Sequence, residues 1–132
     1  MKQTILTSLL LLLASSLFAT GPWSEYAETP PPDGSPAALA GAYVRDIQTG
    51  DLSTCSRYMV PEYLAWLESL GGLESALDVF INADLEKRFA WRQLVEGDVA
   101  RVWVRVFVVT RGREVNVALN LINTSSGWKL TK

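Results

Sequence analysis

The chain has 132 residues, 48% of them hydrophobic, a formal net charge of −2, no histidine and one cysteine. The lack of histidine excludes Ser-His-Asp and Cys-His catalysis, and a single cysteine excludes an internal disulfide and a cysteine-cluster metal site. The slightly acidic balance argues against a dedicated nucleic-acid binder, which is normally basic. We therefore expect one globular domain with no cofactor, no metal and no nucleic-acid partner.

Residues 1–19 are typical of a secretory signal peptide. Lys2 precedes the apolar run ILTSLLLLLASSLFA, whose small final residues favour cleavage after Ala19. A membrane anchor is the rival interpretation, but a membrane-spanning helix needs about 20 apolar residues, and serine and threonine dilute this run. No cysteine follows it, so a lipoprotein anchor is not expected. We expect a periplasmic or secreted bacterial protein, which touches the membrane only through its signal peptide before cleavage.

Residues 20–35 predict a flexible, proline-rich spacer. Three consecutive prolines with glycine, serine and acidic residues cannot form a periodic apolar face. Within this segment, Trp23 and Tyr26 are either a short docking motif for a partner or incidental aromatic residues in a tether.

The domain is expected to span residues 36–132 and to begin with helices. The first starts at the N-cap and first-turn proline Ser35-Pro36, ends at Gly50 and carries an apolar stripe of Leu39, Tyr43 and Ile47. Asp51 is placed to cap a second short helix with Leu52, Cys55 and Met59. Pro61 opens a third helix with Leu64, Leu67 and Leu70, ended by Gly71-Gly72. One more helical stretch carries Leu73, Leu77, Phe80 and Ile81.

From Leu85 the apolar period changes to two, which predicts four strands: LEKRFAWRQLVE, VARVWVRVFVVT, EVNVALNLIN and GWKLTK. The connections are Gly97-Asp98, Arg111-Gly112 and Thr124-Ser125. If each is a two-residue hairpin loop, Phe89 opposes Val106, Val106 opposes Val117, and Leu121 opposes Trp128. Every apolar set then lies on one face, an agreement that a one-residue slip would destroy. Arg111-Gly112 suits a tight turn least, which leaves a wider turn open there.

A helix, a Gly-Asp pair, a second helix and a closing strand carry a family resemblance. The stretches are SPAALAGAYVRDIQTGDLSTCSRYMVPEYL and SSGWKL. The chain, over about residues 36–131, is similar to the nuclear transport factor 2-like (cystatin-like) fold group, and within it to an exported bacterial family of unknown function. The resemblance implies an α+β cone, with N-terminal helices packed on one face of a curved four-stranded antiparallel meander. This fold group hosts isomerases, dehydratases, binding modules and assembly domains, so the fold alone assigns no function.

The second face of the predicted sheet is partly basic and partly aromatic. It carries Arg88, Ala90, Arg92, Leu94, Arg101, Trp103, Arg105, Phe107, Asn116, Ala118, Asn120, Ile122 and Lys129. Arg92 should oppose Trp103 and Arg88 should oppose Phe107, as cation–π pairs. Three interpretations remain open: a solvated face, an apolar patch that buries against a partner or a second copy, and arginines that bind an anionic ligand.

A catalytic cone would need a carboxylate base and a donor such as a tyrosine in an apolar pocket. Candidate tyrosines are Tyr43, Tyr58 and Tyr63, and candidate acids are Asp46, Asp51 and Asp78. At the centre of the predicted inner strand face only Gln93 is polar, so no residue is assigned a catalytic role and an enzyme is not expected. Cys55 shares a helix stripe with Leu52 and Met59, which favours a buried, inert thiol over a reactive one.

We therefore predict a small exported, non-catalytic binding or assembly module of the bacterial cell envelope. Its partner, another protein or a second copy, would contact the outer sheet face at Arg88, Arg92, Arg101, Trp103, Arg105, Phe107 and Asn120. The alternative is a small-ligand-binding or enzymatic cone between helices and sheet, isomerase- or dehydratase-like, lined by Tyr43, Tyr58, Trp66, Phe80 and Trp91.

Overall fold

The computed structural model describes residues 26–50 and 52–132. The predicted signal peptide, Trp23 and Asp51 lie outside the described residues. The elements follow one another as α2 (Pro36–Gln48), the 3-10 helix η1 (Leu52–Tyr58), α3 (Pro61–Glu68), α4 (Leu73–Ala76), α5 (Asp78–Ile81), β1 (Ala83–Glu96), β2 (Val99–Val108), the 3-10 turn η2 (Val109–Arg111), β3 (Arg113–Thr124) and β4 (Gly127–Thr131).

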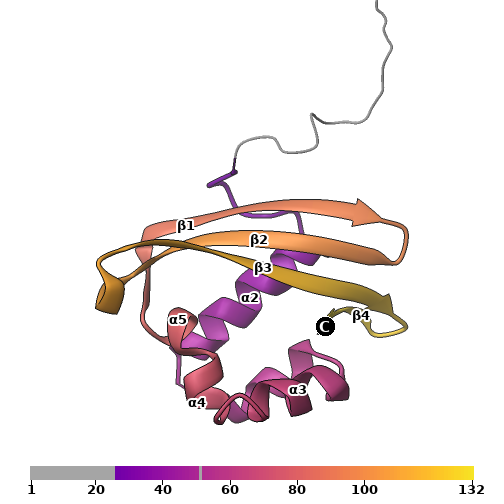
Figure 1. Ribbon diagram of the computed structural model, residues 1–132. Helices are drawn as coiled ribbons and strands as arrows, with labels where there is room; N and C mark the ends of the chain where they lie inside the picture. Colours follow the sequence, from indigo (N-terminus) through magenta and orange to yellow (C-terminus); the bar gives the residue numbers. More distant parts are fainter. Residues whose placement is uncertain (1–25, 51) are drawn as a thin grey trace, which may run out of the picture.

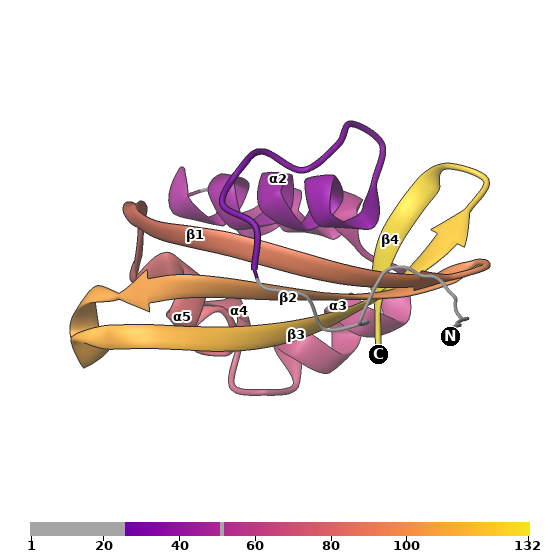
Figure 2. The same ribbon diagram turned by 90° about the horizontal axis from the view of Figure 1, so that it is seen from above.

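The fold is α+β, with four antiparallel strands in the order β1-β2-β3-β4. The sheet is open rather than closed. Figure 1 shows α2, α3, α4 and α5 together on one side of the sheet. From above, α2 runs beside β1, and the shorter helices lie behind β2 and β3 (Figure 2). In the described part of the chain no helix covers the opposite side, which we call the outer face.

Strand β2 confirms the predicted phase of the sheet. Its residues Val102, Val104, Val106 and Val108 are all fully buried, whereas the alternating Trp103, Arg105 and Phe107 keep partial exposure. Side chains alternate between the two faces of a strand. The valines therefore face the helices. Val102 and Val104 join a core that includes Tyr43, Val44 and Ile47 of α2, and Val106 and Val108 form a second cluster with Ala83.

The first hairpin has the predicted register near its turn, but β1 carries a bulge farther along, just after Asp84. Phe107 therefore pairs with Asp84, and the predicted pairing with Arg88 is wrong. The Asp84 side chain accepts hydrogen bonds from the backbone N–H groups of Glu86 and Lys87, each at 3.1 Å. This local turn competes with regular strand pairing and takes up extra residues.

The second hairpin is wider than a two-residue turn. Val106 pairs with Val115, not with Val117 as predicted. The connection includes η2 and Gly112, whose φ of 64° lies in the left-handed region, a conformation that glycine adopts without steric cost.

The third hairpin turns at Ser125-Ser126, one residue later than predicted. Leu121 consequently pairs with Leu130 rather than with Trp128. In both shifted hairpins the partner moves by two residues. Because side chains alternate with a period of two, a shift of two keeps the same residues on the inner face.

Two side chains hold the start of α2. Ser35 is the predicted N-cap, and its Oγ accepts from the backbone N–H of Ala38 at 3.1 Å. Gln93 of β1 supplies a second acceptor, because its Oε1 lies 3.0 Å from the backbone nitrogen of Ala37. The polar residue at the centre of the inner strand face thus satisfies a helix N–H group that has no partner within the helix.

The remaining helices are shorter than the sequence pattern predicts. α3 ends at Glu68, so Leu70, which was predicted to belong to its apolar stripe, lies beyond the helix and is 46% exposed. The stretch from Leu73 to Ile81 divides at Leu77 into two single turns, α4 and α5. Cys55 is completely buried in η1, as expected.

Residues 26–35, part of the expected spacer, contact the edge of β1. Ala27 and Trp91 exchange two backbone hydrogen bonds, at 2.8 and 2.9 Å. The indole Nε1 of Trp91 also donates to the carbonyl oxygen of Thr29 at 2.7 Å. Because antiparallel pairing puts opposite residues on the same side, the neighbours of Ala27, Tyr26 and Glu28, lie toward the outer face.

Candidate functional site on the outer face

The two central strands repeat one side-chain pair on the outer face. Arg101 and Arg105 of β2 lie directly opposite Asn120 and Asn116 of β3. In each pair the arginine Nε donates to the asparagine Oδ1, at 2.9 Å for Arg101 and 2.8 Å for Arg105. These bonds fix the direction in which each guanidinium group leaves the sheet.

Aromatic rings connect these arginines into one stack, which we call the arginine ladder. In order it contains Arg105, Tyr26, Arg92, Trp103 and Arg101. The successive guanidinium-to-ring distances are 4.1, 4.8, 5.2 and 5.8 Å, all within the range of cation–π attraction. The predicted pairing of Arg92 with Trp103 is confirmed.

Tyr26 is the member of the ladder that the sequence did not indicate. Its aromatic character alone suggested a docking motif or an incidental residue. Its place between Arg92 and Arg105 depends on the pairing of Ala27 with Trp91, a contact between residues far apart in the sequence. Local sequence patterns carry no signal for such a contact.

The end of the outer face nearest the β1 bulge is neutralised. Arg88 donates to Glu28 at 2.5 Å and to Glu114 at 2.9 Å. The pKa of Arg88 is raised, mainly by its hydrogen bond to Glu114 and secondly by its hydrogen bond to Glu28. The ring of Phe107 lies under the ammonium group of Lys87, at 3.9 Å, and so has a different cation from the predicted Arg88.

A groove of about 500 Å³ opens at the other end, beside the β1–β2 turn. Its apolar lining comes from Leu94, Val99, Ala100, Trp103 and Leu121, and its polar lining from Glu96, Arg101, Asn120, Thr131 and Lys132. Three of the predicted contact residues, Arg101, Trp103 and Asn120, therefore meet at one hollow. Arg92 and Arg105 belong to the ladder, whereas Arg88 and Phe107 lie at the neutralised end.

A second hollow, of about 300 Å³, lies beside the β1 bulge. Its lining contains charges of both signs, Arg45, Lys87 and Arg88 together with Glu28 and Glu86. The groove differs in having five apolar residues in its lining beside its cations, and small-molecule sites are usually lined by apolar residues with a few polar groups.

The residues proposed to line a cone lie apart from the two described hollows. Tyr43 is buried, and its ring packs edge-on against Tyr58 and Phe80, with centroids 6.0 Å away in both cases. Trp66 is 38% exposed on α3, and Trp91 points its indole N–H at the spacer segment. None of these five residues lines either described hollow.

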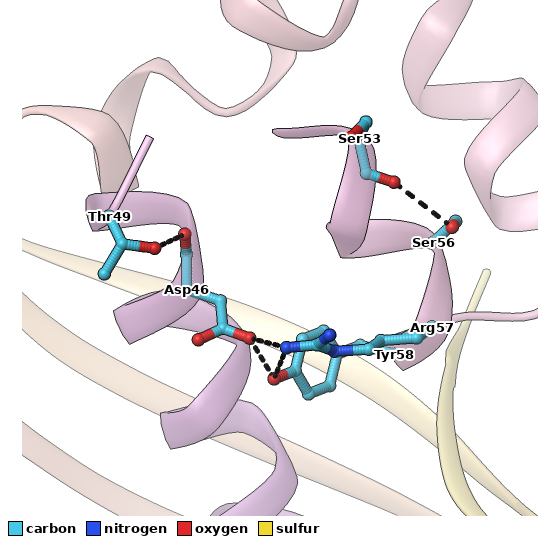
Figure 3. Close-up of polar contacts among 6 residues, drawn as sticks. All are labelled: Asp46, Thr49, Ser53, Ser56, Arg57 and Tyr58. Carbon is cyan, nitrogen blue, oxygen red and sulfur yellow. Dashed lines mark hydrogen bonds and ion pairs between the residues drawn. The ribbon is translucent and has the colours of Figure 1, made fainter. Parts of the chain in front are cut away.

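One predicted acid and one predicted tyrosine do meet: Asp46 of α2 and Tyr58 of η1. Figure 3 shows both side chains, with that of Arg57, pointing toward one another. Asp46 accepts hydrogen bonds from the Tyr58 hydroxyl and from Arg57, the latter at 2.6 Å. The pKa of Asp46 is held below its usual value, mainly by the hydrogen bond from Tyr58 and secondly by the hydrogen bond from Arg57.

The contacts and pKa shifts of this cluster suit a structural brace. Burial, then the bond to Asp46, raises the pKa of Tyr58, so the phenol stays protonated and the carboxylate stays charged. A general base works best with a pKa near the working pH, the opposite of the shift at Asp46. Lys129 of β4 donates to the carbonyl oxygen of Arg57 at 2.6 Å and ties the same corner to the sheet.

The other candidates stand apart from this cluster. Burial raises the pKa of Tyr63, which is buried on α3, and Asp78 accepts a hydrogen bond from Asn82 at 2.9 Å near the surface. Among the described residues, no three acidic or cysteine side chains gather to form a metal site.

Comparison with family models, with curated proteins and with solved structures finds no match for this chain. None of the helices in residues 26–50 and 52–132 is long and apolar enough to cross a membrane.

Proposed function

We propose that the protein is an exported, non-catalytic binding module of the bacterial cell envelope and that it binds through its outer face. The observation that carries this proposal is the groove at the β1–β2 turn, lined by Arg101, Trp103 and Asn120. We further propose that the fold is the nuclear transport factor 2-like cone. Supporting it are a buried inner sheet face and helices gathered on that one side.

Preorganisation of the polar side chains favours binding over a merely solvated surface. The guanidinium groups of Arg101 and Arg105 are each held by an asparagine and an aromatic ring. An arginine that is already ordered loses less side-chain entropy when a ligand arrives. A solvated face needs no such arrangement.

The alternative of a catalytic or ligand-binding cone has less support. Tyr43 and Phe80 pack ring against ring where the cone would need space, and Gln93 is engaged by the N-terminus of α2. Asp46 is held as a charged carboxylate outside the core. The side chains that would have to perform proton transfer therefore have structural partners.

Photo-crosslinking from two exposed valines tests the binding role. Val99 is 51% exposed and lines the groove, whereas Val109 is 60% exposed and lies in η2, away from it. A photoreactive amino acid would replace each valine in turn in the full chain, in a bacterial host that carries the gene. We expect irradiation to produce discrete adducts from position 99 and none from position 109, identified by mass spectrometry.

Adducts should also disappear from position 99 when Trp103→Ala removes the groove wall. Trp66→Ala, which removes an exposed tryptophan of α3, is the matched control and should leave them unchanged. Equal adducts at the two valines, or no adduct at either, would overturn a binding role for the outer face.

A further inference from the structure

The asparagines hold Arg101 and Arg105 without neutralising them. An amide oxygen carries no net charge, and the Nε–H group is one of five donors on a guanidinium group. The carboxylates of Glu28 and Glu114 both bind Arg88 instead. The described residues make no hydrogen bond to the terminal Nη atoms of Arg101 or Arg105. Both groups therefore present a charged, two-pronged donor edge to an incoming ligand.

Cations also lie over aromatic rings of the outer face. Arg92 and Arg101 lie over Trp103, and Lys87 lies over Phe107. Burial of this surface against an apolar partner would strip water from several charges, which is costly unless each finds an opposite charge. An anionic partner meets that requirement and an apolar one does not.

The spacing of the ladder favours a chain of anions over a single ion. Arg101 and Arg105 are four residues apart on one strand, which corresponds to about 13 Å at about 3.3 Å per residue. Arg92 stacks on Trp103, the residue midway between them. A linear ligand along β2 would therefore meet several guanidinium groups in succession.

The groove adds a requirement that charge alone does not satisfy. Beside Arg101 it offers an apolar wall of Leu94 and Trp103, and hydrogen-bonding groups of Asn120 and Thr131. A sugar ring has a C–H face for the apolar wall and hydroxyl groups for the polar side chains. A bare phosphate chain has no group that would contact Leu94.

We propose, on the basis of the binding role proposed above, that the outer face recognises an acidic polysaccharide laid along β2. One acidic group makes paired hydrogen bonds with Arg101, the adjoining sugar occupies the groove, and a later acidic group reaches Arg105. Planar guanidinium groups suit such paired contacts with carboxylate and phosphate oxygens.

Titration calorimetry with a galacturonic acid hexamer, at fixed ionic strength, measures this recognition. We expect the wild-type protein to bind the hexamer, and the double variant Arg101→Gln, Arg105→Gln to bind about 100-fold more weakly, about tenfold for each lost charge-assisted pair. The double variant Arg111→Gln, Arg113→Gln makes the same charge change at two exposed arginines outside the ladder. Its affinity for the hexamer should stay within about twofold of wild type, because salt screens exposed charges that lie outside the binding site.

An isosteric exchange separates recognition from folding. Asn116→Asp together with Asn120→Asp keeps the shape of both partners but gives each arginine a carboxylate of its own. We expect affinity to fall at least about tenfold while the unfolding temperature stays at or above that of wild type. Asn123→Asp, at an exposed site near the same hairpin, controls for the added negative charge and should bind normally.

Two further ligands decide whether sugar and charge are both needed. A neutral maltohexaose and inorganic polyphosphate should each bind at least about tenfold more weakly than the acidic hexamer. Equal or tighter binding of polyphosphate would overturn the assignment of a glycan. Equal loss of affinity in the Arg111, Arg113 control would overturn the ladder as the site.

The two proposals fail in different ways. If crosslinks from Val99 identify a protein or a second copy, and the hexamer does not bind, the binding role stands and the glycan inference is wrong. If neither crosslinks nor hexamer binding is found, both are wrong.

Discussion

At the scale of single residues, several polar side chains have defined hydrogen-bond partners. Gln93 is the clearest case, since it is the polar residue at the centre of an apolar strand face. Its Oε1 accepts the backbone N–H of Ala37, in the first turn of α2, where four N–H groups lack partners within the helix. Together with Ser35 it fixes how the helix starts on the sheet.

Replacing Gln93 tests this role. We expect Gln93→Leu to lower the free energy of unfolding by about 1–2 kcal/mol, because the Ala37 N–H would lose its acceptor in a place with little water. Gln93→Glu keeps an acceptor, and its charge is favoured near a helix N-terminus, so it should remain closer to wild type. Urea unfolding followed by circular dichroism measures both. A leucine variant as stable as wild type would contradict the assignment.

At the scale of elements, the two edges of the sheet differ. The edge of β1 meets Ala27, which pairs with Trp91. On β3, the pairing with β4 covers only Asn120 to Thr124, and within residues 26–50 and 52–132 no strand pairs with the rest of that edge. Unpaired strand edges can form hydrogen bonds with strands of other chains. The directions of the backbone N–H groups on β3 therefore determine where a strand of a second copy could pair.

The hydrogen-bond phase of β3 follows from its turn. Thr124 and Gly127 close a two-residue hairpin, so even-numbered residues of β3 direct their N–H groups toward β4 and odd-numbered residues toward β2. The bond from the Asn123 nitrogen to the Asp98 oxygen, at 2.8 Å, agrees with this phase. Beyond β4, the even-numbered N–H groups therefore point away from β2, toward an edge where the described residues place no strand.

Hydrogen exchange should show this alternation directly. We expect the amide protons of Glu114, Asn116 and Ala118 to exchange quickly, and those of Val115 and Val117, which face β2, to exchange slowly. Residue-resolved NMR in deuterated water gives the rates. Slow exchange at all five positions would mean that the edge is covered, and a fall in protection on dilution would identify a second copy as the cover.

At the scale of the whole molecule, one layer of helices protects one side of the sheet and leaves the other for contact. Buried valines and leucines stabilise the inner side, and the arginine ladder organises the outer side without adding to that core. Substitutions in the ladder should therefore change binding more than folding. Under the proposed function, this division provides a binding surface that needs no movement of the core.

Export itself is a prediction about the complete chain. Expressed in bacteria, the protein should reach the periplasm and begin at Thr20, as measured by the intact mass of the periplasmic fraction. Leu11→Arg places a charge within the apolar run and should block export, whereas Gln3→Arg, before the run, should not. An uncleaved chain in the membrane fraction would support an anchor instead.

The sequence by itself determined the strand phase, the N-cap of α2 and the α+β class. Alternating valines specify one buried face, because one-residue slips would expose all of them. This explains why the inner face was predicted correctly although the residue pairing in two hairpins was not. A register shift of two residues in β3 and β4 changes the partners of each residue but leaves its face unchanged.

Only the tertiary structure decided how the outer face is used. In the tertiary structure Tyr26 lies between Arg92 and Arg105. Glu28 and Glu114 both form ion pairs with Arg88. Arg101 and Arg105 are hydrogen-bonded to neutral asparagines instead. These choices depend on contacts between distant residues and on the lengths of the turns. Local periodicity specifies which side of the sheet a residue occupies, whereas the charge it meets there depends on which distant segment the fold brings beside it.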